Sequence, residues 1–343
     1  MKVTQKQLFD FMTEYEGILD LYKRRFTEDN KRDWRTYEQR LALRAKKASI
    51  ELLPIIERAY ALIGVPEPEK DVGGRPPKAT VPQKVLMLLI KDIFQISNRK
   101  MANMLDLFAA LNNIDISYKT LERAYSEELV KLTIHNAFAI IAKDKGIRES
   151  DTCGDGTGYS LTVTKHYRNE REKELKRING SAKKTKSDDK TKKKRLFTYA
   201  FALMDLDTHM YIGYGTSMHS EKEAFRKAVS MAAAMGIKIN SVRLDKYYSC
   251  QSIVNEFAKN TTIYVIPKSN ATIKGPFAWK RILKSIMNDP IGHLREYFRR
   301  NHSECGFSVD KNMCGRKVWQ KLDDRIDTAL LCKGLWHNLM LMG

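Results

Sequence analysis

The stretch that decides the fold is residues 197–218, FTYAFALMDLDTHMYIGYGTSM. FTYAFALMD (197–205) and MYIGYGTSM (210–218) are rich in aromatic and apolar residues, which favour strands. Between them, residues 206–209 (LDTH) carry the polar side chains typical of a turn. The segment therefore predicts two strands joined by a turn within a buried sheet.

Further elements follow on both sides of this pair. GYSLTVT (158–164) alternates as a first strand. After the pair, Ser220-Glu-Lys-Glu223 reads as a capping box that opens a helix ending at Gly236. The remainder predicts a strand over 239–245 that ends in Asp245, a helix over about 249–259, a strand over 261–266 and then helices. This order predicts an α/β domain in which a mixed sheet has helices on both faces.

The chain divides into four parts by composition. Pro and Gly interrupt the pattern in EPEKDVGGRPPKATVP, which marks a linker. Arg75 and Lys78 lie in it, and such an extended Gly-Arg-Pro segment fits either an A·T-rich minor groove or a plain stiff hinge. The predicted parts are a helical N-terminal region (1–66), the linker (67–82), a second helical region (83–148) and the α/β domain (149–343).

The second helical region contains three short helical patterns. The third starts after Ser117 and places Lys119 and Arg123 outward. Three short helices with a basic third one suggest a DNA-reading helix-turn-helix. A helical bundle used for dimer contacts fits the same pattern.

The charge points to a polyanionic partner. The 343 residues carry a formal net charge of +20, which is typical of proteins that bind nucleic acid. Residues 165–195 hold 14 Lys or Arg against 5 Asp or Glu, a net +9, and include Lys192, Lys193 and Lys194. This segment reads as a basic loop that binds phosphates, or as a solvated insertion. No apolar run is long enough for a membrane span, and five scattered cysteines predict reduced thiols.

A motif near the C-terminus carries the chemistry. Tyr297, Arg300, Glu304 and Lys311 follow the pattern Tyr-x2-Arg-x3-Glu-x6-Lys. On one helix these positions fall within a single arc of ~60°. A carboxylate, two cations and a phenol on one face suit a metal ion beside phosphate oxygens. Gly306 lies inside this run and predicts a helix break.

The motif resembles the signature of a large group of insertion-sequence transposases with an Asp-Asp-Glu triad. That resemblance implies a ribonuclease H-like catalytic domain preceded by helical arms. It implies a prokaryotic cytoplasmic enzyme, associated with the nucleoid and acting as a dimer or higher oligomer on terminal inverted repeats and target DNA. It covers about residues 74–343. Some members carry a β-rich insertion between the second Asp and the Glu, but only 58 residues separate Asp245 from Glu304 here, so none is expected.

Two further acids complete the expected metal site. Asp155 lies in Cys-Gly-Asp-Gly-Thr-Gly, where small neighbours let a DNA backbone approach, and we prefer it to Asp151 as the first acid. Asp245 ends its strand, where α/β sheets place ligand crevices. Clustered carboxylates need cations, and their hard oxygens favour Mg²⁺, with Mn²⁺ as a substitute. Asp155, Asp245 and Glu304 are thus the expected catalytic metal ligands.

The resemblance also implies a reaction and roles. Each transposon end is hydrolysed, and its 3′-hydroxyl then attacks target DNA by two-metal phosphoryl transfer. Arg300 and Lys311 contact backbone phosphates, and Tyr297 lies beside the same DNA. The alternative is a transposase-derived DNA-binding protein without catalysis.

Overall fold

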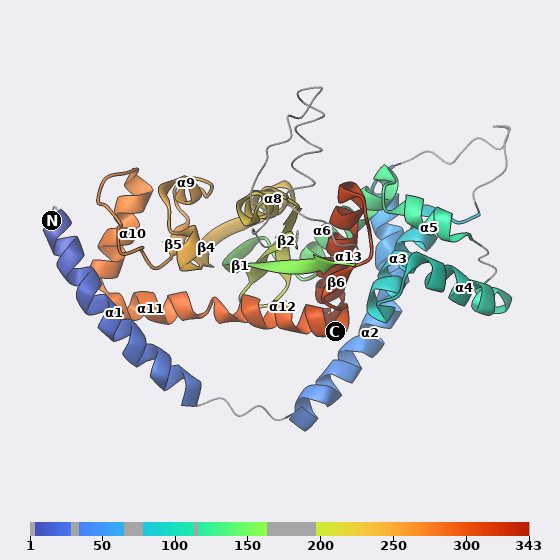
Figure 1. The fold of residues 1–343 in the computed structure, drawn as a ribbon, viewed down its shortest axis with the longest axis horizontal. Helices are drawn as coiled ribbons and strands as arrows, with labels where there is room; N and C mark the ends of the chain where they lie inside the picture. Colours follow the sequence, from blue (N-terminus) through green and yellow to red (C-terminus); the bar gives the residue numbers. More distant parts are fainter. Residues whose placement is uncertain (1–3, 29–33, 65–77, 113–115, 163–196, 343) are drawn as a thin grey trace, which may run out of the picture.

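The sheet forms the centre of the molecule. The computed structural model describes residues 4–28, 34–64, 78–112, 116–162 and 197–342. Within them the strand order is β3-β2-β1-β4-β5, with the two-residue β6 paired to the far end of β1 (Figure 1). β1–β2 and β2–β3 are antiparallel, whereas β1–β4 and β4–β5 are parallel. The strands are β1 Glu149–Leu161, β2 Phe197–Asp205, β3 Tyr211–Ser217, β4 Lys238–Leu244, β5 Thr262–Tyr264 and β6 Lys317–Val318. The expected mixed α/β class is confirmed.

Helices cover both faces of this sheet. On one face, α8 (Glu221–Ala234) approaches so closely that a Cβ on Gly215 would lie 2.0 Å from the Ala224 carbonyl oxygen. On the other face lie α12 (Asn301–Met313) and α13 (Asp323–Leu341), where the Tyr214 ring packs against Gly334. With both faces covered, nearly every residue of β2 and β3 is buried, so both strands read as apolar runs rather than clean alternations.

The start of α8 differs in detail from the predicted capping box. The Ser220 side chain accepts from the Glu223 backbone N–H, as expected. The Glu223 carboxylate, however, accepts from Ser217 Oγ at 2.8 Å instead of reaching back to the Ser220 N–H. Gly236, at φ 70°, follows the C-terminus of the helix as predicted.

The N-terminal helices extend the same core. α2 packs against α6, and α3 packs against α6 and α13. The Trp336 indole on α13 donates to the Leu89 carbonyl on α3 at 2.7 Å, which joins the two regions. A smaller core cluster holds α3, α4 and α5 together. These helices are α1 Gln5–Glu28, α2 Trp34–Ala61, α3 Val81–Phe94, α4 Asn98–Asn112, α5 Tyr118–Ala124 and α6 Glu128–Asp144.

The segment between Asp245 and Glu304 is fully described and contains no β-rich insertion, as expected. The predicted helix over 249–259 is wrong in extent, because only α9 (Gln251–Val254) is helical there, after a 3₁₀ turn η1 (Lys246–Tyr248). The remaining helices of the segment are α10 (Phe277–Asn288) and α11 (Pro290–Phe298). None of the helices among the described residues is both long and apolar enough to cross a membrane.

The predicted break at Gly306 is also wrong, because α12 runs without interruption through it. Gly306 is buried, and a Cβ there would lie 2.5 Å from Met204 Cε and 3.0 Å from the Tyr211 hydroxyl. Glycine therefore serves close packing of the helix on the sheet, which offsets its low helix propensity.

Candidate active site

Asp155 and Asp245 are brought together by the parallel pairing of β1 with β4. The paired register ends at Gly154 opposite Leu244, so the two acids are the next residues on neighbouring strands. Neighbouring strands lie about 4.8 Å apart, which places both carboxylates close together, at the point where β4 ends beside β1. Asp155 is largely buried in the middle of β1, while the Asp245 side chain is 40% exposed.

Glu304 reaches the same place from α12. The Arg300 guanidinium lies 2.8 Å from the Glu304 carboxylate and 3.8 Å from that of Asp245. The Tyr297 hydroxyl donates to Asp245 at 3.4 Å, and its ring lies 5.6 Å from the Arg300 guanidinium carbon. Arg299 and Arg300 keep right-handed helical dihedrals between α11 and α12, which keeps Tyr297, Arg300 and Glu304 on one face. The structure thus gathers the second acid and the glutamate around one cation.

The surroundings of Asp155 disfavour its charged form. Burial raises the pKa of Asp155 to about 6. A hydrogen bond from the Gly156 N–H at 2.9 Å and the charge of Arg300 lower this pKa, but the negative charges of Glu304 and Asp245 raise it. Because Asp155 is buried beside two other carboxylates, its charged form costs free energy even with Arg300 nearby.

The donor chemistry of these acids fits a hard divalent cation. They offer only oxygen ligands, and a cation beside them would offset the repulsion among Asp155, Glu304 and Asp245. As they stand, no three His, Cys, Asp or Glu side chains of the described residues are grouped closely enough to hold one ion. Arg300 lies between Asp245 and Glu304 instead.

Lys311 lies further along the same helix, against β1. Its ammonium donates to the Thr157 hydroxyl and lies 5.3 Å from the centre of the Tyr159 ring. Burial and the charge of Arg316 lower the pKa of Lys311, while Asp155 raises it. The unbroken α12 therefore carries Lys311 to the strand that bears Asp155.

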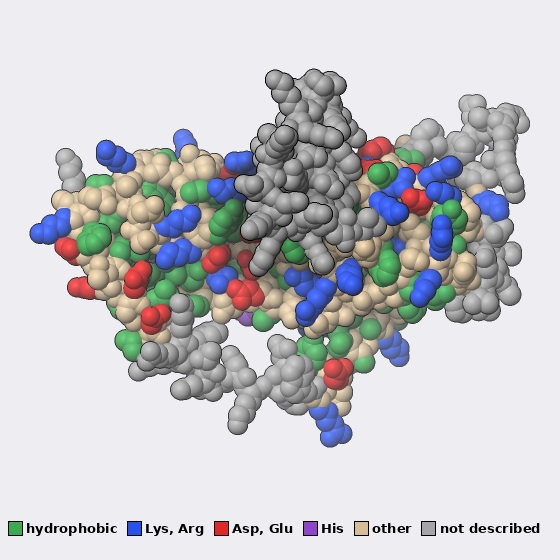
Figure 2. Space-filling view, viewed as in Figure 1, with side chains coloured by type: hydrophobic (Ala, Val, Ile, Leu, Met, Phe, Trp, Pro, Cys, Tyr) green, Lys and Arg blue, Asp and Glu red, His purple; other side chains and the backbone are tan. Residues whose placement is uncertain are grey.

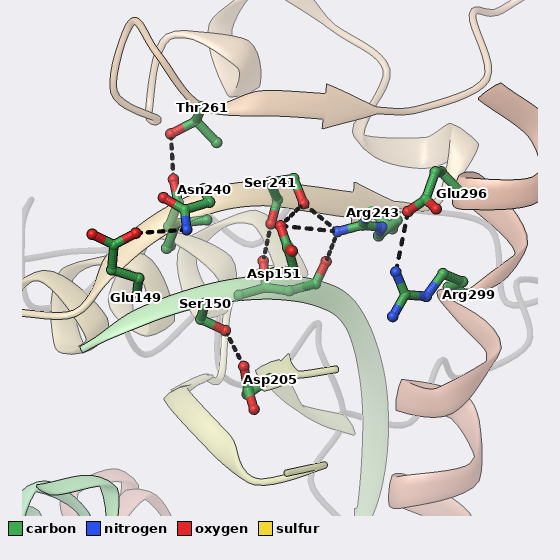
Figure 3. Close-up of polar contacts among 12 residues, drawn as sticks. Glu149, Ser150, Asp151, Asp205, Asn240, Ser241, Arg243, Thr261, Glu296 and Arg299 are labelled. Carbon is green, nitrogen blue, oxygen red and sulfur yellow. Dashed lines mark hydrogen bonds and ion pairs between the residues drawn. The ribbon is translucent and has the colours of Figure 1, made fainter. Parts of the chain in front are cut away.

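A buried arginine that the sequence analysis missed ties these elements together. Arg243 on β4 is 3% exposed and forms an ion pair with Glu296 on α11 (Figure 3). Arg299 shares the Glu296 carboxylate at 3.3 Å. Arg243 also donates to Ser241 Oγ. Since Glu296 immediately precedes Tyr297 and Arg243 lies two residues before Asp245, this cluster fixes α11 against the end of β4. The sequence feature that could have revealed this cluster is Arg243 itself, a single cationic residue within the strand predicted over 239–245.

Asp151, the alternative first acid, belongs to that cluster and not to the group around Arg300. Its carboxylate accepts from Ser241 and lies 3.9 Å from Arg243 (Figure 3). It is half-exposed and stands four residues before Asp155, ~13 Å along the strand. The structure therefore brings Asp155, and not Asp151, next to Asp245.

A comparison with known proteins identifies the family. No family model matches the chain. A probable transposase for insertion sequence element ISA1214 from Archaeoglobus fulgidus is 39% identical over 330 residues, which are 96% of this chain and 95% of that protein. The chain belongs to the insertion-sequence transposases. Because the match covers 96% of the chain, it extends into residues 1–66. The resemblance based on the C-terminal motif did not cover this region.

In this transposase, α1 lies against the part of the domain that carries Tyr297. The Gln5 side chain donates to the Ala271 carbonyl at 3.1 Å and accepts from the Ile273 N–H at 3.1 Å. Tyr15 is fully buried, and burial together with the nearby Tyr297 raises its pKa. The first helix thus supports α11 from outside (Figure 1).

Only some of the predicted DNA-binding residues lie in segments that the structure describes. Lys119 and Arg123 are exposed on α5, where Lys119 pairs with Glu122 at 3.2 Å. Lys78 is exposed just before α3. Arg75, Lys192, Lys193, Lys194 and the basic segment 165–195 lie outside the described residues. Figure 2 shows acidic side chains near the centre of the drawn face, with Lys and Arg on both sides of them.

The unfavourable charge on Asp155 predicts that Asp155→Asn stabilises the transposase. The folded-state pKa of about 6 exceeds the ordinary 3.8, so this group stabilises the fold below pH 3.8 and loses that contribution as pH rises to 6. At pH 7.5 in EDTA, urea unfolding should show the variant more stable than wild type by about 2–3 kcal/mol. The difference should shrink at pH 4.

Added Mg²⁺ provides the control for this experiment, since it should stabilise wild type and leave Asp155→Asn nearly unchanged. Equal stabilities of both proteins at pH 7.5 in EDTA would show that Asp155 is not under electrostatic strain.

Proposed function

We propose that this transposase cleaves the ends of its insertion sequence and joins the freed 3′-hydroxyls to target DNA. The proposed reaction is phosphodiester hydrolysis followed by in-line strand transfer, without a covalent protein intermediate. Asp155, Asp245 and Glu304 are its proposed catalytic residues. The family membership supports a transposase, and the position of these acids beside the end of β4 supports this chemistry.

One observation carries the proposal. Three carboxylates from β1, the end of β4 and α12 lie around Arg300, and burial together with the other two carboxylates raises the pKa of Asp155 to about 6. A folded protein keeps such unbalanced charge where a further cation binds during function. The order of strands and helices is also compatible with the ribonuclease H-like domain that the Tyr-Arg-Glu-Lys group uses, and we assign the transposase to that group.

Divalent metal chemistry fits this donor set. Mg²⁺, or Mn²⁺ in its place, would be held by Asp155, Asp245 and Glu304, and would activate the attacking oxygen and stabilise the leaving one. Asp155 and Asp245 are already adjacent across β1 and β4. Glu304 is now paired with Arg300, so it must exchange that partner to join them.

Arg300 and Lys311 then serve the DNA backbone. Arg300 Nε is buried without a hydrogen-bond partner among the described residues, so the guanidinium is incompletely paired. Once the carboxylates have another cation, Arg300 is free to bind a phosphate near the cleaved bond through charge-assisted hydrogen bonds. Lys311, beside Thr157 on β1, adds a second phosphate contact, and Tyr297 orients Asp245.

The rest of the DNA is proposed to bind basic parts of the chain. Lys119 and Arg123 on α5 and the segment 165–195 would contact the terminal repeats. Two ends must be processed together, so the working form is proposed to be a homodimer or larger oligomer on paired ends. Salt should weaken this binding steeply, because each neutralised phosphate releases counterions.

Cleavage of the element's own ends tests the proposal. The full chain is incubated with Mg²⁺ and DNA that carries the terminal repeats flanking its gene, with Asp245→Ala as control. We expect nicking at the ends that the variant lacks. Binding without any cleavage would instead support a DNA-binding protein that has lost catalysis. Cutting without preference for the repeats would support a general nuclease.

A further inference from the structure

The outer face of α2 carries a line of solvent-exposed apolar side chains. Leu43, Ile50 and Leu53 are 62%, 63% and 40% exposed. At about 100° per residue, these three positions fall within one arc of ~80° around the helix. Isolated apolar residues are ordinary on a protein surface, but three in one line along a helix are typical of a surface that binds another protein.

The core of the protein uses the opposite side of the same helix. That side packs against α3, α6 and α13, and its buried residues are Ala48, Leu52, Ile55, Ile56 and Ala59. A surface helix needs only one apolar face to hold its place in a fold, so the outer line of α2 is not explained by its own fold. The first turns of α2 also extend away from the sheet (Figure 1), which leaves the outer face accessible.

Charge is unevenly distributed along α2. Residues 35–47 contain five Lys or Arg and one Glu, whereas residues 48–61 contain two Glu and one Arg. That single arginine, Arg58, forms an ion pair with Asp144 of α6 at 2.8 Å, so its charge is already neutralised. The first half of the helix is therefore basic, and the second half is acidic.

This charge pattern matches a second copy of the same helix that runs in the opposite direction. Two antiparallel α2 helices place the basic half of each beside the acidic half of the other, whereas parallel helices would place like charges together. A two-fold axis produces every such contact twice. Lys47 and Glu51 are available for these contacts, because both are exposed and neither forms an ion pair with another residue that the structure describes.

We propose that the outer face of α2 binds the same face of a second copy of this transposase, with the two helices antiparallel about a two-fold axis beside Ile50. In this register Ile50 contacts Ile50 of the second copy. Leu43 of each copy then contacts Leu53 of the other. Lys47 of each copy contacts Glu51 of the other. This inference rests on the proposed function, which needs two copies on paired ends, and adds the surface through which they meet.

The size of this surface indicates when it acts. Three apolar side chains from each copy make a smaller contact than that of a stable dimer. Two copies that are bound to the ends of one DNA molecule are held at a high effective concentration, at which a weak contact is sufficient. The α2 surface therefore pairs copies that have both bound their ends, and the pairing depends on DNA.

Looping of a DNA that carries both terminal repeats measures this pairing without any cleavage. Tethered-particle motion gives the looped fraction with the full chain in EDTA, and anisotropy gives the affinity for a single repeat. Lys47→Glu and Glu51→Lys should each lower the ratio of looped to open DNA about 10- to 50-fold, because two attractions become two repulsions. Ile50→Asp should abolish looping. The affinity of each variant for a single repeat should stay within a few-fold of wild type.

An equal mixture of the two charge variants is the sharpest arm of this experiment. In a pair that contains one copy of each variant, opposite charges face each other at both contacts. Looping should therefore return on about half of the DNA molecules, those that bind one copy of each. Lys47→Glu and Glu51→Lys together in one chain should restore looping as well.

Glu14→Lys is the matched control, since it makes the same change of charge at an exposed position of α1 and should loop the DNA as wild type does. Single charge variants that loop as wild type does would overturn the inference. A mixture as defective as its two components would also overturn it, because a different occupant would then cover this face. If wild type cleaves the repeats but none of these variants alters looping, only this inference fails. If looping follows the prediction but Mg²⁺ never induces cleavage, the proposed function fails and the α2 surface stands.

Discussion

Asp245→Asn is expected to abolish cleavage of the repeat ends while leaving their binding nearly intact. The amide keeps the shape of the side chain and the hydrogen bond from Tyr297, but it removes the charge that a divalent cation requires. Loss of one ligand of this kind should lower the single-turnover cleavage rate at least ~10³-fold. Glu304→Gln should behave in the same way. Gel assays on end-labelled repeat DNA give the rate, and anisotropy gives the affinity.

Asp151→Asn provides the matched control. It is another carboxylate on β1, but it pairs with Ser241 and Arg243 away from the proposed site. Its cleavage rate should stay within a few-fold of wild type. If Asp151→Asn were inactive and Asp245→Asn active, the first and second acids would have been assigned to the wrong cluster.

Asp310→Ala is expected to cause the largest loss of stability. Asp310 on α12 is fully buried and accepts from the Tyr211 hydroxyl and from His337 Nδ1, each at 2.8 Å. The His337 and Tyr211 rings stack with their centres 3.8 Å apart, and the other nitrogen of His337 lies 2.9 Å from the His209 carbonyl oxygen. This network joins α12 to β3 and α13.

Removing the shared acceptor leaves two buried donors without partners. Such groups cost about 1–3 kcal/mol each, so the free energy of unfolding should fall by about 3–5 kcal/mol. Scanning calorimetry should show a midpoint several degrees lower. Because α12 also carries Glu304 and Lys311, cleavage should fall as well.

Asp207→Ala tests whether any lost carboxylate has this effect. Asp207 is exposed in the turn between β2 and β3, so its removal should change the midpoint very little. An Asp310→Ala protein with the same melting midpoint as wild type would show that the network does not stabilise the packing of α12.

The local patterns in the sequence predicted the elements that bear the proposed site. Apolar runs and a turn located β2 and β3, and the strand predicted over 239–245 is β4, which ends one residue before Asp245. The first strand began earlier than predicted, at Glu149, because its polar and glycine-rich half lacks alternation. The spacing of the C-terminal motif placed Tyr297, Arg300 and Glu304 on one face because the backbone between α11 and α12 stays helical.

Long-range packing determined what the sequence did not reveal. β6 pairs with the far end of β1. Because it is only two residues long, no periodic pattern in the sequence could predict it. Gly306 remains helical because close packing of α12 on Met204 and Tyr211, which leaves no room for a side chain there, offsets its low helix propensity. Arg243 is buried because Glu296, over 50 positions away, neutralises it. The segment 165–195, which carries much of the basic charge, lies outside the described residues, so its DNA-binding role stays a prediction.

The central claim is that Asp155, Asp245 and Glu304 bind the same divalent ions. Iron-directed cleavage tests it most directly, since Fe²⁺ that replaces Mg²⁺ generates hydroxyl radicals, with ascorbate and peroxide, which cut the nearest polypeptide. The account predicts protein fragments ending near residues 155, 245 and 304 together, all suppressed by excess Mg²⁺ and absent from Asp245→Asn. Cuts confined to one of these segments, or located elsewhere in the chain, would contradict it.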